Sequence, residues 1–360
     1  MKKVHNFSAG PCILPKSVLE KAAQAVINFE DSGLSLIEMS HRTKPFENVM
    51  AKAQALVKEL LNVPDDYSIL FLQGGASLGF YMTALNVMKE GGKAAYANTG
   101  VWATGAIKQA KLVGQVEVVA SSEDKNFNYI PKGFTIPSDV DYFHFTSNNT
   151  IFGTQWKEFP KSPVPVICDM SSDIFSKKIN VADFAIIYAG AQKNMGPAGS
   201  TLYIVKNDIL DKTGRKLPDM LNLKLQAEKE SMFNTPPVFP IYVNMLTLEW
   251  LKSIGGVEAI EKINQQKADL LYNEIDSNPL FVGTVEKEDR SNMNACFLLK
   301  DESLKDEFDA MWKEAGISGI NGHRSVGGYR ASMYNALPLE SVQALVDVMK
   351  ALKVKVGVTA

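Results

Sequence analysis

Seven short apolar runs, interspersed with helical patterns, are the feature that most restricts the fold of this chain. Each run has the length and composition of a buried strand. The runs cover residues 68–73, 93–97, 116–120, 142–146, 164–168, 184–189 and 201–205. Apolar residues at helical spacing occupy residues 16–31, 44–61, 78–89 and 101–112. This alternation predicts an α/β fold with a mostly parallel seven-stranded sheet that helices cover on both faces.

The pattern changes after about residue 240. Two helical patterns at residues 243–253 and 257–275 are followed by residues 295–299, 303–315, 328–334 and 339–352, which read as a mixture of strands and helices. We expect a smaller C-terminal α+β domain here, joined to the large domain through the long helix at residues 257–275. The predicted division is a large domain of residues 16–255 and a small domain of residues 1–15 and 256–360.

Composition excludes several classes of function. The 360 residues carry a net charge of −2 without a basic block, so neither nucleic acid nor an anionic membrane is an expected partner. Cys12, Cys168 and Cys296 have no CxxC spacing, and the four histidines form no i, i+4 pair, so no metal site is expected. Because the sequence has neither a signal-peptide pattern nor an apolar run of membrane-spanning length, we predict a cytoplasmic protein.

Lys193 stands just beyond the apolar run at residues 184–189 and is followed by turn residues. Burial lowers the pKa of a lysine, and a neutral amine is the nucleophile that forms a Schiff base with an aldehyde. The simpler interpretation of a single lysine is a surface charge that opens a loop. Which of these two interpretations holds for Lys193 depends on the residues that lie near it in the fold.

Other strand ends carry residues that suit a phosphorylated aromatic cofactor. Gly74-Gly75-Ala76-Ser77 follows the first run, where glycines and free helix N–H groups favour phosphate, although such a turn is also common without a ligand. Asp169, 24 residues before Lys193, can pair with a protonated ring nitrogen or cap a helix. Trp102 can stack on a ring or fill the core, and Thr150 can bind a ligand or shape a turn.

Cationic residues form a second group in the sequence. His41-Arg42 follows a polar loop, and His323-Arg324 precedes a glycine-bounded loop that leads to Arg330. Arginine suits bidentate capture of carboxylate or phosphate, whereas any single arginine is more often a solvated surface charge. Together these residues indicate an anionic substrate.

With these residues assembled, the chain resembles, from end to end, the phosphoserine aminotransferases, which are class V members of the fold-type I pyridoxal-phosphate enzymes. Six motifs carry the resemblance: Phe7-Ser8-Ala9-Gly10-Pro11, Ser40-His41-Arg42, Gly74-Gly75-Ala76-Ser77, Ala191-Gln192-Lys193-Asn194, Asn234-Thr235-Pro236-Pro237, and Gly322-His323-Arg324 through Arg330-Ala331-Ser332. The first and the last are the most specific to this family, since a lysine after a strand is shared by the whole superfamily.

The resemblance implies pyridoxal 5'-phosphate bound as a Schiff base to Lys193, which also acts as the catalytic base. It implies that Asp169 pairs with the pyridine nitrogen, Trp102 stacks on the ring and Thr150 supports the ring hydroxyl. The residues implied to hold the cofactor phosphate are Ala76, Ser77, Gln192, Asn234 and Thr235. The implied substrate-binding residues are Ser8, His41, Arg42, His323, Arg324 and Arg330, of which Arg330 takes the α-carboxylate.

The implied reaction is ping-pong transfer of the amino group of L-glutamate to 3-phosphohydroxypyruvate, giving O-phospho-L-serine and 2-oxoglutarate for serine biosynthesis. A second phosphorylated keto acid, from pyridoxine biosynthesis, stays open as a substrate. The family's Asn-Thr pair reaches the neighbouring active site, so the resemblance also implies a homodimer in which Asn234 and Thr235 do so.

Several alternatives use the same fold. One is another class V aminotransferase of the alanine–glyoxylate type. A cysteine desulfurase needs a mobile cysteine, whereas Cys296 lies in an apolar run. A nicotinamide oxidoreductase needs a GxGxxG turn, which the Gly74-Gly75 turn does not supply, and a binding module has no need of Lys193, Asp169 and Trp102 together.

Overall fold

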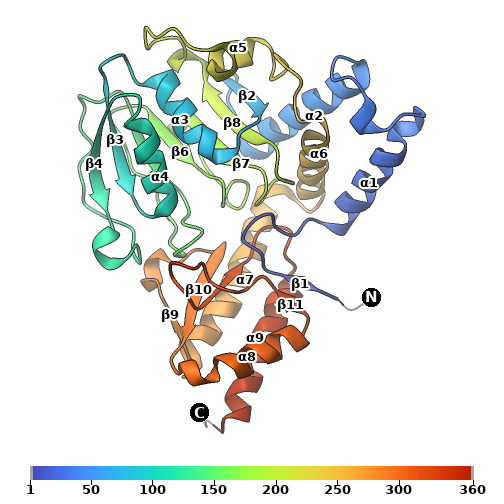
Figure 1. Cartoon of the computed structure of the whole chain (residues 1–360), viewed down its shortest axis with the longest axis vertical. Coiled ribbons are helices and arrows are strands. Elements are labelled where there is room, and N and C mark those ends of the chain that lie inside the picture. Colours follow the sequence, from blue (N-terminus) through green and yellow to red (C-terminus); the bar gives the residue numbers. More distant parts are fainter. Residues whose placement is uncertain (1–2, 358–360) are drawn as a thin grey trace.

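A seven-stranded sheet forms the larger part of the structure, a computed structural model that describes residues 3–357 (Figure 1). Its strands, in spatial order, are β2 (Tyr67–Leu72), β8 (Thr201–Lys206), β7 (Ile186–Gly190), β6 (Val166–Asp169), β5 (Phe143–Thr146), β3 (Lys93–Asn98) and β4 (Gln115–Ser121). Only β8 runs against its neighbours, and the other pairings are parallel. The predicted mostly parallel α/β sheet is therefore confirmed.

Helices cover both faces of this sheet. The helices on its two sides are α2 (Lys44–Leu61), α3 (Gly75–Val87), α4 (Val101–Ala110), α5 (Leu223–Glu228) and α6 (Val238–Ser253), with α1 (Lys16–Ile27) packed outside α6. The apolar residues of α1, α2 and α6 share one core with one face of the sheet, and those of α3 and α4 share another core with the opposite face. Within residues 3–357, no helix has both the length and the apolar character needed to cross a membrane.

A second, smaller group of elements has its own hydrophobic core. It contains the sheet β9 (Phe281–Gly283), β10 (Asn294–Leu299) and β12 (Tyr329–Ser332), the pair β1 (His5–Asn6) and β11 (Ile317–Ser318), and the helices α7 (Gly256–Ser277), α8 (Lys305–Glu314) and α9 (Leu339–Lys355). Phe7 packs in this core although it lies at the other end of the chain. Helix α7 contributes to two cores. Ile260 belongs to the core that contains α6, and Leu271 belongs to the core of the smaller group of elements.

Element boundaries differ from the predicted ones where backbone geometry decides them. The helix predicted at residues 44–61 is α2 with the same bounds. Helix α3 begins at Gly75 instead of residue 78, because Gly74 (φ +101°) takes a left-handed conformation at the helix N-cap. The helix predicted at residues 16–31 ends at Ile27, and Glu30 (φ +46°) breaks the helical path.

Close packing of α3 on β7 generates a testable prediction. A Cβ added at Gly79 would lie 2.7 Å from Cδ2 of Tyr188, a fully buried ring. We expect Gly79→Ala to lower the free energy of unfolding by about 1–3 kcal/mol, because the overpacked helix must shift away from the sheet. Chemical denaturation followed by circular dichroism measures this change.

Gly105→Ala in α4 is the matched control, since its added Cβ meets nothing closer than Phe80 Cε2 at 3.4 Å. We expect this variant to be as stable as the parent or more stable by up to about 1 kcal/mol, through helix propensity alone. Equal destabilisation by the two substitutions would contradict the packing argument.

Candidate active site

Lys193 lies in the turn that directly follows β7. Its Nζ donates a hydrogen bond to Thr150 Oγ1 at 2.7 Å and lies 5.9 Å from the centroid of the Trp102 ring. Thr150 follows β5, and Trp102 stands in the first turn of α4, just after β3. Because β7, β5 and β3 are parallel strands of one sheet, their C-terminal ends bring these three side chains together.

Burial and nearby charges set the ionisation of Lys193. Burial lowers the pKa of its ammonium group to about 8; the charge of Asp169 opposes this shift and that of Arg330 adds to it. A free lysine has a pKa of about 10.4, so a much larger fraction of Lys193 is the neutral, nucleophilic amine near neutral pH. The environment therefore activates this amine.

Asp169 is the last residue of β6, the strand between β5 and β7, and it is almost fully buried. Its Oδ1 accepts hydrogen bonds from the backbone N–H of Ser171 at 2.9 Å and from Ser171 Oγ at 2.6 Å. Burial raises the pKa of the Asp169 carboxyl, while the Ser171 hydroxyl and the charge of Lys193 oppose that shift. A buried carboxylate in this position can hold a cationic ring nitrogen.

Arg330, in β12 of the smaller group of elements, completes the cluster around Lys193. Its Nη1 donates to the backbone oxygen of Thr150 at 3.2 Å, and its buried Nε has no partner within residues 3–357. Burial, together with the charges of Arg330 and Arg324, lowers the pKa of His323, whose Nδ1 lies 2.6 Å from Ser325 Oγ. Arg330 thus contacts the strand-end cluster, and His323 lies close enough to Arg330 for that charge to lower its pKa.

The N-terminal segment runs against the Lys193 turn. The backbone N–H of Cys12 donates to the backbone oxygen of Gln192 at 3.1 Å, and the Cys12 thiol donates to the backbone oxygen of Lys193. A Cβ added at Gly10 would lie 3.6 Å from Cγ of both Gln192 and Lys193. The half-buried Ser8 precedes this contact and packs against Gly319.

Helix α3 begins just after β2, which runs in the same direction as β7, and its first turn has no side-chain cap. Ala76 and Ser77 therefore offer backbone N–H groups that an anion can accept. The contact of Gly79 with Tyr188 places this turn over β7, the strand that leads to Lys193. Gln73 Nε2, just before the turn, donates to the backbone oxygen of Thr235 at 3.0 Å.

Two predicted groups have no hydrogen bond or ion pair to the Lys193 cluster within residues 3–357. His41 and Arg42 lie at the bend before α2, where His41 is buried with an unpartnered Nε2 and Arg42 is exposed. Asn234 is half-buried, and its Nδ2 approaches the backbone oxygen of Thr235 at 3.4 Å. The binding roles of these residues stay predictions.

Several residues near the site were not found from the sequence. Asn194, next to Lys193, accepts a hydrogen bond at Oδ1 from the backbone N–H of Asn335 at 2.9 Å. Lys267 in α7 is fully buried and donates to the backbone oxygens of Met333, Tyr334 and Leu337, in the segment that contains Asn335. The spacing of Asp169 and Ser171 could have revealed that hydrogen-bonded turn, but no local pattern announces contacts across 141 residues.

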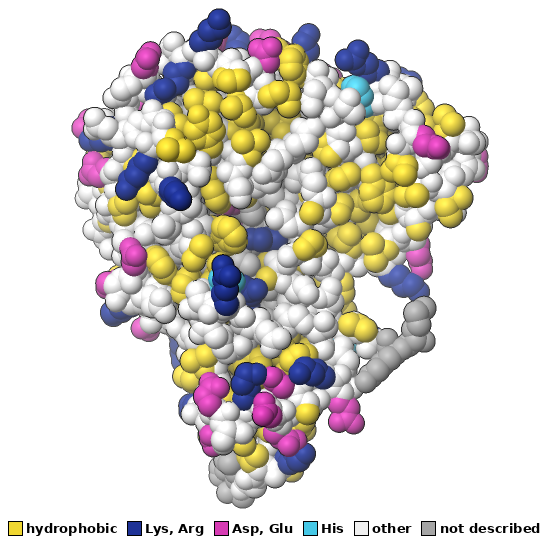
Figure 2. Space-filling view, viewed as in Figure 1, with side chains coloured by type: hydrophobic (Ala, Val, Ile, Leu, Met, Phe, Trp, Pro, Cys, Tyr) yellow, Lys and Arg dark blue, Asp and Glu magenta, His cyan; other side chains and the backbone are white. Residues whose placement is uncertain are grey.

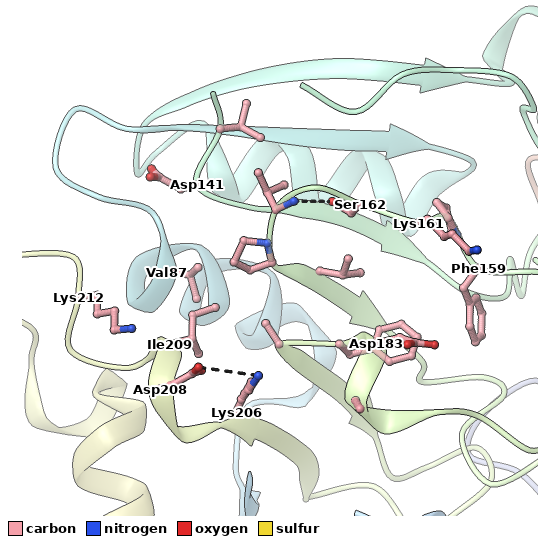
Figure 3. A pocket seen from close by; sticks show the side chains of 18 of the residues that line it. Val87, Asp141, Phe159, Lys161, Ser162, Asp183, Lys206, Asp208, Ile209 and Lys212 are labelled. Carbon is pink, nitrogen blue, oxygen red and sulfur yellow. Dashed lines mark hydrogen bonds and ion pairs between the residues drawn. The ribbon is translucent and has the colours of Figure 1, made fainter. Parts of the chain in front are cut away.

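The candidate site is separate from another cavity of the molecule. Figure 2 shows Lys, Arg and His side chains gathered in the hollow where the broad part of the molecule meets its narrower part. A cavity of about 990 Å³ lies instead at the opposite end of the sheet, beneath the first residues of β6 and β7 (Figure 3). Lys206 and Asp208 pair there at 3.8 Å, and none of the candidate site residues lines this cavity.

The cluster has the chemistry of a site for a planar, phosphorylated, cationic heteroaromatic aldehyde. The amine of Lys193 can react with a carbonyl group, Asp169 can pair with a ring cation, and Trp102 offers a face for stacking. The uncapped turn of α3 suits a phosphate, and the unpartnered Nε of Arg330 needs an acceptor. Within residues 3–357, no group of three or more His, Cys, Asp or Glu side chains could hold a metal ion.

Fold and site together define a class of protein: the family described as Aminotransferase class-V matches residues 4–345, and the chain belongs to it. The chain is 64% identical over 357 residues to a phosphoserine aminotransferase from Flavobacterium psychrophilum, covering 99% of this chain and 100% of that one. The resemblance inferred from the motifs, to the phosphoserine aminotransferases, is thus confirmed.

Solved structures agree with this placement. A phosphoserine aminotransferase from Bacillus circulans subsp. alkalophilus has a TM-score of 0.95 and 44% identity, over 99% of each chain. A phosphoserine aminotransferase from Trichomonas vaginalis, solved with PLP bound, has a TM-score of 0.92 and 36% identity, over 97% of this chain and 100% of that one. The prediction of fold type I is therefore confirmed as well.

The charges around Lys193 predict how its reactivity depends on pH. In the apo-protein, the rate at which Lys193 condenses with an aromatic aldehyde should rise with pH around a midpoint of about 8. Asp169→Asn should move this midpoint to lower pH, because its carboxylate raises the pKa of Lys193. Arg330→Met should move it to higher pH, because its guanidinium lowers that pKa.

The absorbance of the imine measures the rate at each pH and so gives these midpoints. The signal of a Lys193→Ala variant, which comes from imines on the other lysines, is subtracted. A wild-type midpoint near the value of about 10.4 of a free lysine, or shifts of the same sign in the two variants, would contradict the electrostatic account.

Proposed function

We propose that this protein holds pyridoxal 5'-phosphate on Lys193 and transfers the amino group between L-glutamate and 3-phosphohydroxypyruvate. The products are O-phospho-L-serine and 2-oxoglutarate, which places the reaction in serine biosynthesis. The observation that carries the proposal is the activated amine of Lys193, 2.7 Å from Thr150 Oγ1 and electrostatically coupled to Asp169 and Arg330. Relatives of 53–64% identity are named phosphoserine aminotransferases, so the alanine–glyoxylate alternative is not favoured.

Pyridoxal phosphate, when bound, supplies a reactive carbonyl carbon and an electron-withdrawing ring that stabilises negative charge at the substrate's α carbon. Lys193 would hold the cofactor through its neutral amine, and the same amine, when free, would be the base that moves the α proton of the substrate. The hydrogen bond to Thr150 Oγ1 fixes the position of Lys193 Nζ above the strand ends. One residue thus binds the cofactor and transfers the proton.

Asp169 keeps the ring nitrogen protonated, and the two hydrogen bonds from Ser171 hold its carboxylate in place. Trp102 would stack on the ring, and Thr150 would support the ring hydroxyl. The N–H groups of Ala76 and Ser77, in the first turn of α3, would hold the phosphate together with Gln192.

Arg330 binds the α-carboxylate that both substrates share, since its guanidinium is fixed by Thr150 and its buried Nε is without a partner. The distal phosphate or side-chain carboxylate meets His323 and Arg324, together with Ser8, His41 and Arg42. A cationic site of this kind accepts two chemically different acids in turn, as a ping-pong reaction requires. Whether the longer phosphorylated keto acid of pyridoxine biosynthesis also binds stays a prediction.

The desulfurase alternative is not supported by the state of Cys296. This residue is 3% exposed in β10, and burial raises the pKa of its thiol to about 12. A thiol that stays protonated and enclosed cannot act as a mobile nucleophile.

Domain division, assembly and location belong to the same proposal. The cores on the two faces of the large sheet and the separate core of the smaller group of elements support a large domain of residues 16–255 and a small domain of residues 1–15 and 256–360. We further propose a homodimer in which Asn234 and Thr235 hold the cofactor phosphate of the neighbouring chain. The hydrophobic patches visible in Figure 2 support a partner on this face. A cytoplasmic location is supported by three unpaired cysteines.

The holo-protein should be yellow, and L-glutamate should shift its visible absorption as the amino group passes to the cofactor. Lys193→Ala should lose this response and lower turnover by orders of magnitude, because both the attachment of the cofactor and the proton transfer are lost. Lys212→Ala, an exposed lysine at the opposite end of the sheet, is the matched control and should behave as wild type. A colourless protein that takes up no pyridoxal phosphate would disprove the proposal.

The dimer proposal predicts complementation between two inactive chains. One chain carries Lys193→Ala, and the other carries the double change Asn234→Ala, Thr235→Ala. A dimer made of either variant alone should have weakened activity. In a mixed dimer, one site would combine an intact Lys193 with the other chain's intact Asn234 and Thr235, so activity should return. If the pair served its own chain, neither site of the mixed dimer would be complete, and no activity would return.

A further inference from the structure

The loop that carries His323 and Arg324 has no polar tether to the large sheet. We call residues 321–328 the cationic loop. Within residues 3–357, its hydrogen bonds stay inside its own hairpin: the N–H of Gly322 donates to the oxygen of Gly328 at 2.8 Å, and that of Val326 donates to the oxygen of His323 at 2.8 Å. These bonds fix the shape of the loop, but they do not fix where its tip lies relative to the large sheet.

An apolar contact does join the cationic loop to the large sheet. Val326, the only apolar side chain of the loop, is half-buried and packs against a small cluster of Phe127, Ile151 and Phe152, which we call the apolar seat. The rings of Phe127 and Phe152 lie 5.1 Å apart between centroids. Ile151 and Phe152 directly follow Thr150, so the seat adjoins a residue of the strand-end cluster.

The packing behind the cationic loop is tight. The gap between the loop and β10 is lined by Ile151, Val326 and residues of β10, and it is too small to hold a water molecule. A Cβ added at Gly328 (φ +57°) would lie 2.3 Å from Cδ2 of Leu298, so the base of the loop lies directly on β10. On this side, the contact of Val326 is therefore shielded from water, and burial of its apolar surface stabilises the position of the loop.

Phe127 takes part in the apolar seat with a backbone conformation that large side chains rarely adopt. Its φ is +59°, and it follows Asn126 at +53°, so two successive residues are left-handed. This conformation is unfavourable for a bulky residue, and it persists only where the surrounding structure requires it. Here the two left-handed residues precede a ring that is 8% exposed and packed on Phe152. The local strain is thus associated with the seat.

Charge repulsion opposes this position of the cationic loop. Within residues 3–357, Arg290 is the only arginine in an ion pair, so neither Arg324 nor Arg330 is paired with an acid. Burial lowers the pKa of His323, and the charges of Arg330 and Arg324 lower it further. Because neighbouring like charges repel, the loop needs an attractive contact to stay beside Arg330, and the packing of Val326 supplies one.

We propose that Val326 is a positioning residue that sets the affinity of the site for the distal anionic group of its substrates. Its contact with the apolar seat holds the cationic loop where His323 and Arg324 can bind that group, and the inference rests on the proposed function in this respect. A loop that occupies its binding position for only part of the time binds with an affinity reduced by that fraction. Loss of the contact should consequently weaken binding and leave the chemistry at the α carbon unchanged.

The half-reaction of the holo-protein with two amino acids tests this proposal. Stopped-flow absorbance gives the apparent Kd and the limiting rate for O-phospho-L-serine and for L-alanine, which has the same α-carboxylate but no distal anion. Val326→Ala should weaken binding of O-phospho-L-serine roughly fivefold or more and keep the limiting rate within about twofold of wild type. The kinetics with L-alanine should stay the same. An equal loss for both amino acids would overturn the proposal, because it would indicate a general disturbance of the site.

Three further variants test the contact itself. Val326→Ile keeps the apolar side chain and should bind O-phospho-L-serine nearly as wild type does. Phe127→Gly removes the contact from the side of the seat, without a side chain in the left-handed region, and should weaken binding as Val326→Ala does. Val282→Ala is the matched control, since this valine of β9 is 40% exposed and lies outside the seat, and it should behave as wild type. Wild-type binding in both Val326→Ala and Phe127→Gly would contradict the proposal.

A double-mutant cycle shows whether Val326 acts through the cations. In a chain with His323→Ala and Arg324→Ala, Val326→Ala should have no further effect, because the loop then carries no cation to position. A further loss of the same size would overturn the proposal. Wild-type protein that reacts with neither O-phospho-L-serine nor L-glutamate would instead refute the proposed function, so the two failures are distinguishable.

Discussion

Burial of both faces of the seven-stranded sheet is the constraint on which the rest of the structure depends. Helices seal each face with its own core, so polar side chains of the sheet strands gather at the strand ends. Neighbouring parallel strands end at one edge, and Trp102, Thr150, Asp169 and Lys193 follow or end four of them. The active site therefore results from the direction of the strands.

At that edge, low solvent access makes each charge depend on its neighbours. Lys193 is destabilised as a cation by burial and by Arg330, and stabilised by Asp169. The same burial acts against the carboxylate of Asp169, which Ser171 and Lys193 support. An amine that reacts near neutral pH and a carboxylate that holds a cationic ring thus arise from one electrostatic balance.

The smaller group of elements contributes through contacts that are remote in sequence. Arg330 reaches Thr150 from β12, and Asn335 donates to Asn194, the residue after Lys193. Lys267 fixes the segment around Asn335 from α7 by binding three backbone oxygens. Motion of this group relative to the sheet would consequently be felt at Lys193, which suits a site that must admit two substrates in turn.

The sequence by itself determined the strands, most helices and the residue types at the strand ends, because hydrophobic periodicity and turn chemistry are local. It also placed Lys193 and Arg330 in one family's motifs. Only the tertiary structure decided which groups remote in sequence touch: Asn335 on Asn194, Cys12 on Lys193, and Arg330 on Thr150. Pairing, burial and pKa depend on what lies across the fold, and neighbouring residues along the chain carry no record of it.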